Sequence, residues 1–470
     1  MAGITSVAVC GAGAMGSGIA QVAAQAGASV KLFDVDADAL TASRKRITGD
    51  LDKLVAKGKL TADAASEIVD RLAWTTRLED LGDRALVIEA VIEDAGIKGD
   101  LFGRLEAVVA PDAVIATNTS SIPVSRLARP LRHPGRFVGM HFFNPATVMK
   151  LVEVVAGAGS DPAIVEQVRV TAREWGKVAI VVADVPGFIV NRVARPFYAE
   201  AFMALSEGAA DPASIDALFR VAGFRMGPLE LTDLIGQDVN FAVARSVFES
   251  YFGRTRFVPQ LRQAALVDAG WLGRKTGRGV YDYAESANAA PPAPLPAVLD
   301  EHRQAAKALK DSPPGTFVRC GSIFIGATQG LTARQESRAL GGPVALLDWS
   351  PADGAGPVSF SVSEDVARPA ALGTLSAMSK SGVETADRPG LIVARTLAQL
   401  ANAAADAVLE NVADEDGIDA ALRFGANYPF GPFSWADRFG RKALVGLLDA
   451  IADNTGEAMY RPSHYLRNAA

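Results

Sequence analysis

The chain has 470 residues, 49% of them hydrophobic and 21% charged, a composition that is ordinary for a folded protein and predicts roughly two to four domains. Its formal net charge of -6 argues against a nucleic acid or an anionic membrane as partner. Cys10 and Cys320 lie far apart in apolar runs, which favours a reducing compartment over a disulfide framework. The first ten residues lack the charged region of a signal peptide and no apolar run reaches transmembrane length, so we expect a cytoplasmic protein.

A nucleotide-binding signature opens the chain. The apolar run Ser6–Cys10 predicts a strand, and the run G-A-G-A-M-G and a helix-like stretch follow it directly. Gly11 permits a tight turn, Gly13 lets the backbone approach a pyrophosphate, and Gly16 allows helix and strand to pack closely. A second predicted strand ends at Asp34, whose carboxylate would bind the adenosine ribose and repel a 2′-phosphate. This order predicts a Rossmann site that prefers NAD to NADP.

The next elements continue an α/β pattern. Residues 37–72 read as two antiparallel helices joined by a glycine turn, and strands are predicted at 85–90 and 113–117. The alternation predicts a parallel sheet with helices on both faces. Polar residues Asn118–Ser121 follow the last of these strands, at the edge where ligands bind, so Ser120 is a candidate contact to substrate or nicotinamide. The alternative is that this loop merely caps the next helix.

Two apolar runs between Phe137 and Val155 carry one chargeable residue each, His141 and Glu153. A hairpin centred near Thr147 would set these two side chains opposite one another. A carboxylate bonded to one imidazole nitrogen fixes the tautomer and leaves the other nitrogen free to take a proton, which is how a general base is built. A core histidine on a salt-bridged strand is the alternative.

After Pro186 and Gly187 a helix with few charges is predicted over 188–205. Asn191 and Arg195 lie one turn apart on one of its faces. An asparagine at such a place can also be a cap or a polar edge.

The second half of the chain repeats the first. The run Asp184–Arg192 recurs at Asp387–Arg395, an offset of 203 residues, and Ala394 stands where Asn191 should be. We therefore expect the copy to be a structural or substrate-covering helical domain without an active site. An Ala- and Pro-rich segment, residues 284–296, is predicted to link the halves.

Between linker and copy, Gly341–Asp348 is similar to Gly27–Asp34. In that register Ile325 and Ala327 occupy the places of the turn glycines, which predicts a shortened Rossmann-like half that binds no nucleotide. No counterpart of the histidine and glutamate pair is visible there.

The motifs taken together resemble the short-chain L-3-hydroxyacyl-CoA dehydrogenase family, from Ser6 to Tyr283 and again in the copy. Relatives of the phenylacetate-degradation type share the added half. The resemblance implies an NAD-dependent enzyme of fatty acid metabolism or phenylacetate degradation that oxidises a short (S)-3-hydroxyacyl-CoA, such as 3-hydroxybutyryl-CoA, to the 3-oxoacyl-CoA. The motifs that carry it are G-A-G-A-M-G-S-G-I-A at Gly11, E-A-V-I-E-D at Glu89, N-T-S-S at Asn118, M-H-F-F-N-P at Met140 and D-V-P-G-F-I-V-N-R at Asp184.

The resemblance also implies roles for individual residues. His141 would be the base and Glu153 its orienting carboxylate, while Ser120 and Asn191 would hydrogen-bond the substrate oxygen. For Lys98, among the NAD positions, a solvated helix lysine is the alternative. The positions that match NAD contacts are Gly11, Gly13, Ala14, Met15, Gly16, Asp34, Glu93, Lys98, Ser120, Asn144 and Lys275.

Substrate recognition is the less determined part. Lys57, on the helical pair, matches a coenzyme A contact, although Asp50 replaces a nearby serine of the family. One hypothesis is that Arg195 pairs with a carboxylate at the far end of the acyl chain, as in 3-hydroxyadipyl-CoA, and the alternative is a surface or interdomain ion pair. A dehydrogenase of a small non-CoA hydroxy acid and a non-catalytic, crystallin-like NAD-binding protein remain as other readings. We expect no metal.

The expected architecture is an α/β Rossmann domain, an all-helical domain, a reduced Rossmann-like segment and a second helical domain. Family members with one helical domain pair it with that of a second subunit. The chain would then be a pseudo-dimer in itself, with a homodimer left open. The predicted domains are 1–187, 188–283, the linker 284–300, 301–385 and 386–470.

Overall fold

A computed structural model describes residues 3–284, 296–310, 312 and 315–470. Most of the predicted linker, residues 285–295, lies outside the described residues. The chain divides into two compact units, Met1–Val190 with Asn411–Ala426, and Asn191–Glu410 with Asn427–Ala470. None of the helices among the described residues has the length and apolar character that a membrane crossing requires.

The first unit is built on an eight-stranded sheet in the order β3-β2-β1-β4-β5-β6-β7-β8. Neighbouring strands are parallel except β6 and β7, which run antiparallel. The apolar strands form because helices cover them, and β4 and β5 are buried along their whole length. The strands are β1 Ser6–Cys10, β2 Ser29–Phe33, β3 Leu72–Thr75, β4 Leu86–Glu89, β5 Val114–Thr117, β6 Phe137–Phe142, β7 Leu151–Ala156 and β8 Val178–Ala183.

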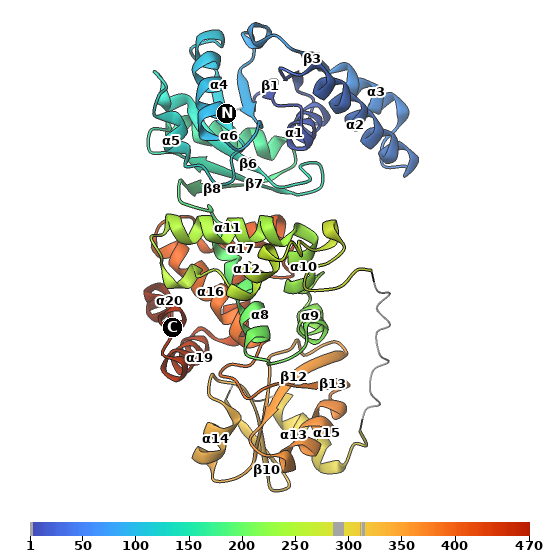
Figure 1. The fold of residues 1–470 in the computed structure, drawn as a ribbon, viewed down its shortest axis with the longest axis vertical. Helices are drawn as coiled ribbons and strands as arrows, with labels where there is room; N and C mark the ends of the chain where they lie inside the picture. Colours follow the sequence, from blue (N-terminus) through green and yellow to red (C-terminus); the bar gives the residue numbers. More distant parts are fainter. Residues whose placement is uncertain (1–2, 285–295, 311, 313–314) are drawn as a thin grey trace. The chain divides into compact units, whose positions relative to one another are not determined.

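Helices pack on this sheet, and two of them form the predicted pair. Gly58, at φ 65°, ends the first helix of the pair in the left-handed conformation that favours glycine, which allows the chain to turn back into the second. Figure 1 shows this pair, α2 and α3, side by side next to β3. The helices of the unit are α1 Ala14–Gln25, α2 Ala37–Ala56, α3 Ala62–Asp70, α4 Ala95–Val108, α5 Val124–Ala128, α6 Pro162–Glu174 and, from the second copy, α17 Glu415–Gly425, with α7 Val190–Val193 at its border.

The second unit contains both helical copies except α17. Its central helix, α16, is buried on all sides from Val393 to Ala407, which explains why ten of these fifteen residues are Ala, Leu or Val. Figure 1 shows α8 of the first copy beside α16 of the second. The longer helices are α8 Arg195–Ser206, α9 Pro212–Val221, α10 Pro228–Ile235, α11 Gln237–Ser250, α12 Leu261–Asp268, α16 Val393–Leu409, α18 Pro432–Phe439, α19 Arg441–Thr455 and α20 His464–Ala469.

A second, five-stranded sheet belongs to this unit, in the order β13-β12-β11-β10-β9. From β10 to β13 the pairings are parallel, antiparallel and parallel, the same succession as from β5 to β8 in the first sheet. Its elements are β9 Phe317–Cys320, β10 Ile323–Ala327, β11 Val344–Leu347, β12 Gly356–Val362 and β13 Lys380–Glu384, with α13 Asp300–Lys310, α14 Ala333–Leu340 and α15 Arg368–Ala377.

The predicted register of this reduced half is therefore wrong. Asp184 caps α5 by accepting from the amides of Val124 and Ser125, and its copy Asp387 caps α14 in the same way. Residues 323–347 thus correspond to the unit β5-α5-β6, and Gly341–Asp348 is no copy of the segment that ends at Asp34. A short apolar strand followed by an acidic residue occurs more than once in such a sheet, since Asp184 follows β8 as Asp34 follows β2, so this pattern does not identify a particular strand.

The two helical copies contact their surroundings in a reciprocal manner. The amide of Ala183 donates to the carbonyl of Val412 over 3.0 Å, and the amide of Ala386 donates to that of Ala209 over 3.2 Å. Both partners of the second bond are related to those of the first by the offset of 203. Likewise α17 packs on β7 and β8, while its counterpart α9 packs on β12.

An ion-pair network repeats this reciprocity between the copies. Arg192 binds Glu410 at 2.8 Å, and their counterparts Arg395 and Glu207 lie 3.7 Å apart. Contacts in which residue i meets j and j meets i are the mark of a two-fold interface. Reciprocal contacts within one chain are expected when two subunits of a two-fold dimer have become fused.

Candidate active site

His141 and Glu153 form a buried pair on neighbouring strands. They lie directly opposite one another in the antiparallel pairing of β6 with β7, as the predicted hairpin register requires. His141 Nδ1 and Glu153 Oε2 are 2.7 Å apart, and the two residues are only 6% and 1% exposed. A carboxylate can only accept here, so Nδ1 carries a hydrogen and Nε2 is left with a free lone pair.

The second oxygen of Glu153 is also bonded, which fixes the carboxylate in place. Oε1 accepts from the amides of Ile189 and Val190 at 3.0 and 3.1 Å. These amides follow Phe188, which is buried at φ 45°, an uncommon conformation for a bulky residue. The ring centroids of Phe188 and His141 are 5.6 Å apart. This turn therefore holds the carboxylate through its amides and packs an aromatic ring against the imidazole.

The polar loop after β5 lies beside the histidine strand. Asn118 Oδ1 accepts from the amide of Phe142, the residue after His141. Glu93 holds the same loop, because its Oε1 accepts from the amides of Ser120 and Ser121 and from the hydroxyl of Thr119. The loop does not cap α5, whose first amides bind Asp184, so the capping alternative is wrong.

Lys98 is part of this network and is not a solvated helix lysine. Its ammonium lies 2.6 Å from Glu89 and 3.0 Å from Glu93, and the residue is 1% exposed. Burial opposes ionisation of Glu93, but the Thr119 hydroxyl and the Lys98 ammonium outweigh it and lower the pKa of Glu93 to about 2. Sequence reasoning missed Glu89 and Thr119. A glutamate at the end of a buried strand was the available signal.

The glycine turn has the geometry of a phosphate cradle. A Cβ on Gly11 or Gly16 would collide with backbone oxygens at 2.5 and 1.8 Å, whereas a Cβ on Gly13 would meet nothing within 4 Å. No side chain caps α1, which begins at Ala14, so its first amides face that open space. A cavity of about 480 Å³ adjoins the turn and is lined by Asp34. The turn therefore fits a dinucleotide.

Asp34 is hydrogen-bonded to the glycine turn. Its Oδ2 accepts from the amide of Ala12 at 2.7 Å and its Oδ1 from Asp36 at 3.1 Å. Of the other predicted NAD positions, Met15 packs against the core, Asn144 is exposed, and Lys275 pairs with Asp238 at 2.6 Å. Those roles stay predictions.

The predicted coenzyme A residues lie on the surface of the first unit. Lys57 ends α2 and is exposed, while Asp50 pairs with Lys53 of the same helix at 2.7 Å. A lysine so placed can reach a phosphate, and Asp50 faces solvent as its charge requires.

Asn191 and Arg195 differ in their environments. Asn191 is half-buried on α7, and Arg195 begins α8 and is 7% exposed. Arg195 forms no ion pair among the described residues, and its low exposure contradicts the alternative of a surface ion pair. Its guanidinium carbon instead lies 5.0 Å from the ring centre of Tyr198.

The second half preserves the strand positions of the site but not its catalytic residue types. Asp348 follows β11 opposite Ser359, the places that His141 and Glu153 hold in the first sheet, and Ser359 donates its hydroxyl to the Asp348 carboxylate. Asp348 also accepts from the amides of residues 392–394. A counterpart of the pair therefore exists, contrary to prediction. This counterpart contains no imidazole, and its Asp348 carboxylate binds the amino-terminal end of α16.

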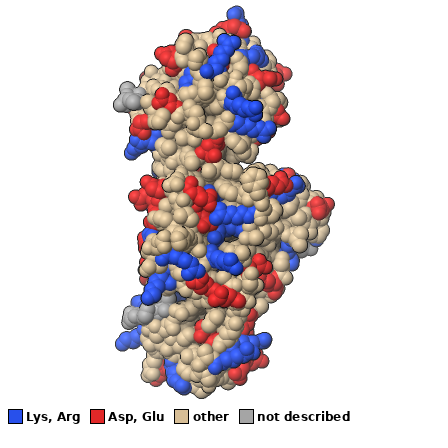
Figure 2. Space-filling view, turned by 90° about the vertical axis from the view of Figure 1, so that its left-hand side faces the viewer, with Lys and Arg blue, Asp and Glu red and all other residues tan. Residues whose placement is uncertain are grey.

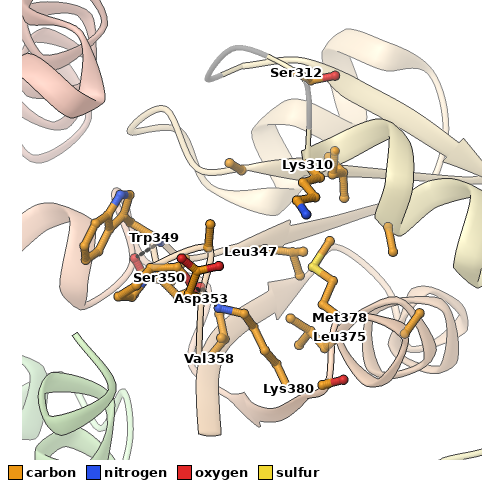
Figure 3. Close-up of a pocket in the computed structure, with 18 of the residues that line it drawn as sticks. Lys310, Ser312, Leu347, Trp349, Ser350, Asp353, Val358, Leu375, Met378 and Lys380 are labelled. Atoms are coloured by element: carbon orange, nitrogen blue, oxygen red, sulfur yellow. Dashed lines mark hydrogen bonds between the residues drawn. The ribbon is translucent and has the colours of Figure 1, made fainter. Parts of the chain in front are cut away.

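A cavity of about 1170 Å³ lies beside Asp348. Figure 3 shows its wall of Leu347, Leu375 and Met378, with Lys310 and Lys380 reaching toward it. The Lys380 ammonium is occupied by Ser350 and by the carbonyl of Pro351. None of the described residues that line this cavity is a histidine, so they offer no counterpart of the base.

Elsewhere in the second unit, potential ligand atoms of Glu301, His302 and Cys320 lie within 4.8 Å of one another. The His302 Nδ1 already accepts from the amide of Leu299, and burial raises the pKa of the Cys320 thiol. Both features oppose metal binding by this group. On the surface, Figure 2 shows acidic and basic side chains interspersed over the visible face.

Two family models together match most of the chain. Residues 6–185 match the NAD binding domain of 3-hydroxyacyl-CoA dehydrogenase, and residues 187–283 and 390–470 both match its C-terminal domain. The chain belongs to the 3-hydroxyacyl-CoA dehydrogenase family. It is therefore an NAD-dependent oxidoreductase, and the duplication of the helical domain within this dehydrogenase is confirmed.

Relatives extend the likeness to the added half. The dehydrogenase is 42% identical to a 3-hydroxyadipyl-CoA dehydrogenase of Escherichia coli, over 100% of this chain and 98% of that protein. It is 40% identical to a probable 3-hydroxybutyryl-CoA dehydrogenase of Bacillus subtilis, over 60% of this chain and 98% of the relative. A crystal structure of a 3-hydroxybutyryl-CoA dehydrogenase from E. coli superposes with a TM-score of 0.92, covering 99% of this chain and 98% of the other at 41% identity. The predicted fold class is confirmed.

Proposed function

We propose that this dehydrogenase oxidises the 3-hydroxyl group of a short (S)-3-hydroxyacyl-CoA and that His141 is its general base. The observation that supports the proposal most directly is the 2.7 Å contact between His141 Nδ1 and a Glu153 carboxylate that is itself anchored by two amides. An imidazole held in this way keeps Nε2 as a proton acceptor.

In the proposed oxidation the hydroxyl proton passes to His141 Nε2 while the C3–O bond becomes a carbonyl. Glu153 stabilises the imidazolium that forms, because its carboxylate stays ionised beside it. NAD, when bound, supplies the acceptor for the hydride that leaves C3. The low exposure of His141 and the aromatic rings of Phe143 and Phe188 keep bulk water from the proton.

We also propose roles for the residues that would bind the substrate. Ser120 and Asn191 would hydrogen-bond the substrate oxygen, and the Glu93 contacts would hold the Ser120 loop in position. Lys57, exposed at the end of α2, would bind a coenzyme A phosphate. A cytoplasmic enzyme that acts on acyl-CoA without a nucleic-acid or membrane partner would fit these roles.

The test is the oxidation of NADH with acetoacetyl-CoA and with free acetoacetate. We expect turnover of the thioester, and a fall of roughly two to four decades in kcat for His141→Ala. His133→Ala is the matched control, because His133 is exposed and outside the site. Retention of kcat within a few-fold in His141→Ala would contradict the base, and turnover of acetoacetate alone would favour the non-CoA reading. Absence of turnover with both substrates would favour a non-catalytic, crystallin-like NAD-binding protein.

We also propose that the fused copy replaces the second subunit of shorter relatives. The reciprocal Arg192–Glu410 and Arg395–Glu207 contacts support this. Sedimentation should give a species near the chain mass of 49.1 kDa, and a species of twice that mass would show further association.

A further inference from the structure

Arg195 differs from every other buried arginine among the described residues. Six arginines are buried there, and five of them form ion pairs with glutamate or aspartate. Arg195 forms none, and its Nε and Nη1 are buried without a hydrogen-bond partner. Burial lowers the pKa of Arg195, and only Tyr198 and Tyr428 oppose that effect. A buried cation without a counter-charge is costly, so its retention suggests that an anion supplies the missing partner.

Two tyrosines complete the surroundings of this guanidinium. Tyr198 lies one turn further along α8, beneath the guanidinium. Tyr428 is 6% exposed and its hydroxyl has no partner within the described part of the chain. Burial raises the pKa of both phenols, so both stay protonated and can donate hydrogen bonds.

The tyrosines belong to different copies of the helical domain. Tyr428 precedes α18 of the second copy, and its ring packs on Phe197 and Phe224 of the first, with centroids 5.4 and 5.0 Å away. The wall around the polar groups is thus aromatic and apolar, which strengthens any charge interaction inside it. The equivalent of Arg195 in the copy is an alanine, Ala398, so the cluster occurs once.

The cluster matches a carboxylate in charge and in donor number. A guanidinium offers a planar fork to two oxygens, and one or two phenols can satisfy the remaining lone pairs. Asn191 lies on α7 and Arg195 begins α8. Because Ala194 between them keeps αR backbone angles, the four-residue spacing corresponds to about 6 Å along the helical path. A carboxylate three carbon–carbon bonds beyond the 3-hydroxyl carbon lies roughly 4 Å from it, with a hydrogen bond still to add.

We propose that Arg195, Tyr198 and Tyr428 form a carboxylate subsite, and that the substrates are dicarboxylic 3-hydroxyacyl-CoA thioesters with a free carboxylate at the far end of a short chain. This inference rests on the proposed function and on the role of Asn191 in it. It also gives the second helical copy a direct part in the site, because Tyr428 comes from that copy.

The experiment compares kcat/KM for two thioesters of equal chain length, 3-oxoadipyl-CoA and 3-oxohexanoyl-CoA, with NADH. Wild type should prefer the dicarboxylic substrate by roughly a hundredfold or more, since a site built for a polar group rejects the analogue that lacks it. Arg195→Leu should lose roughly a hundredfold on 3-oxoadipyl-CoA and stay within about threefold on 3-oxohexanoyl-CoA. Arg195→Lys should recover part of the preference. Arg225→Leu, which removes an exposed arginine of the same helical copy, should change neither value.

A milder variant separates the contribution of the second copy. Tyr428→Phe removes one hydroxyl and no bulk, and should lower kcat/KM about tenfold on the dicarboxylic substrate alone. Turnover of 3-oxohexanoyl-CoA reports in every variant that the fold and the proton-transfer groups are intact. Equal losses on both substrates in Arg195→Leu and Tyr428→Phe, or a wild type without preference, would overturn the inference while the proposed function stands. Turnover of neither thioester by wild type would overturn both.

Discussion

Replacement of Glu153 by glutamine is the sharpest test of how the imidazole is held. The two side chains have the same shape, so the change removes a charge and turns one acceptor into a donor. In the native site Glu153 accepts from three donors, the His141 Nδ1 hydrogen and the amides of Ile189 and Val190. Glutamine has one oxygen, and it cannot accept from the amides and from the imidazole with separate atoms.

The consequence for His141 follows from these contacts. The two amides hold the glutamine oxygen, because they are fixed donors, and the glutamine NH₂ then faces Nδ1. The imidazole must accept at Nδ1 and carry its hydrogen on Nε2, which is the wrong tautomer for taking a proton from substrate. The equivalent change in a Ser-His-Asp triad lowers kcat about 10⁴-fold. We expect a loss of roughly 10³- to 10⁴-fold in kcat, which corresponds to about 4 to 5.5 kcal/mol.

The assay is NADH oxidation with acetoacetyl-CoA at saturating cofactor. The KM for acetoacetyl-CoA should change little, because Glu153 acts through His141 and has no proposed contact with the substrate. Glu166→Gln is the matched control, since Glu166 belongs to the same unit and pairs with Arg169 on the surface. Glu153→Asp keeps the charge and should retain more activity than the glutamine variant.

A kcat for Glu153→Gln within tenfold of wild type, with a folded protein shown by its thermal transition, would refute the reasoning. It would mean that the orientation and tautomer of the imidazole do not depend on this carboxylate. A large loss in the Glu166→Gln control would equally contradict it, because a general effect of charge would then suffice.

Two further predictions concern the cofactor turn and the acidic network. Gly13→Ala should change the free energy of unfolding by less than about 0.5 kcal/mol but should raise the KM for NADH, because its Cβ would enter only the open space before α1. Gly16→Ala should lower the melting temperature, because its Cβ would lie 1.8 Å from a backbone oxygen. The pKa of Glu93 falls on folding, from its ordinary 4.5 to about 2, so its stabilising effect is present above pH 4.5 and is lost as the pH falls toward 2. Glu93→Gln should therefore melt below wild type at neutral pH by a margin that shrinks over that range, and a margin independent of pH would contradict the role of its charge.

The structure bears out the inferences that rest on short-range pattern. The alternation of side chains along a strand predicts that His141 lies opposite Glu153, because register in a hairpin follows from where the turn is centred, and β6 and β7 pair in this register. The glycine turn, and the position of Asp34 next to it, were predicted in the same way, from a spacing that the chemistry of a dinucleotide requires. The internal repeat was readable because its offset is constant.

Other features depended on residues that meet only when the chain is folded. Nothing near Lys98 in sequence shows that it lies buried between Glu89 and Glu93, since a lysine on a helix is most often solvated. The strand pairing of the reduced half could not be read either, because strands of one sheet share the same apolar pattern.

The amino-acid sequence by itself determined the family, the cofactor and the pairing of His141 with Glu153, because each depends on residues that are close together or at fixed spacing. Only the tertiary structure decided the surroundings of Arg195, because burial and missing partners are properties of packing between distant segments. Tyr428 lies more than two hundred residues beyond Arg195 and comes from the other copy of the helical domain. Its place beside that arginine is set by the association of the two copies, which no local pattern encodes.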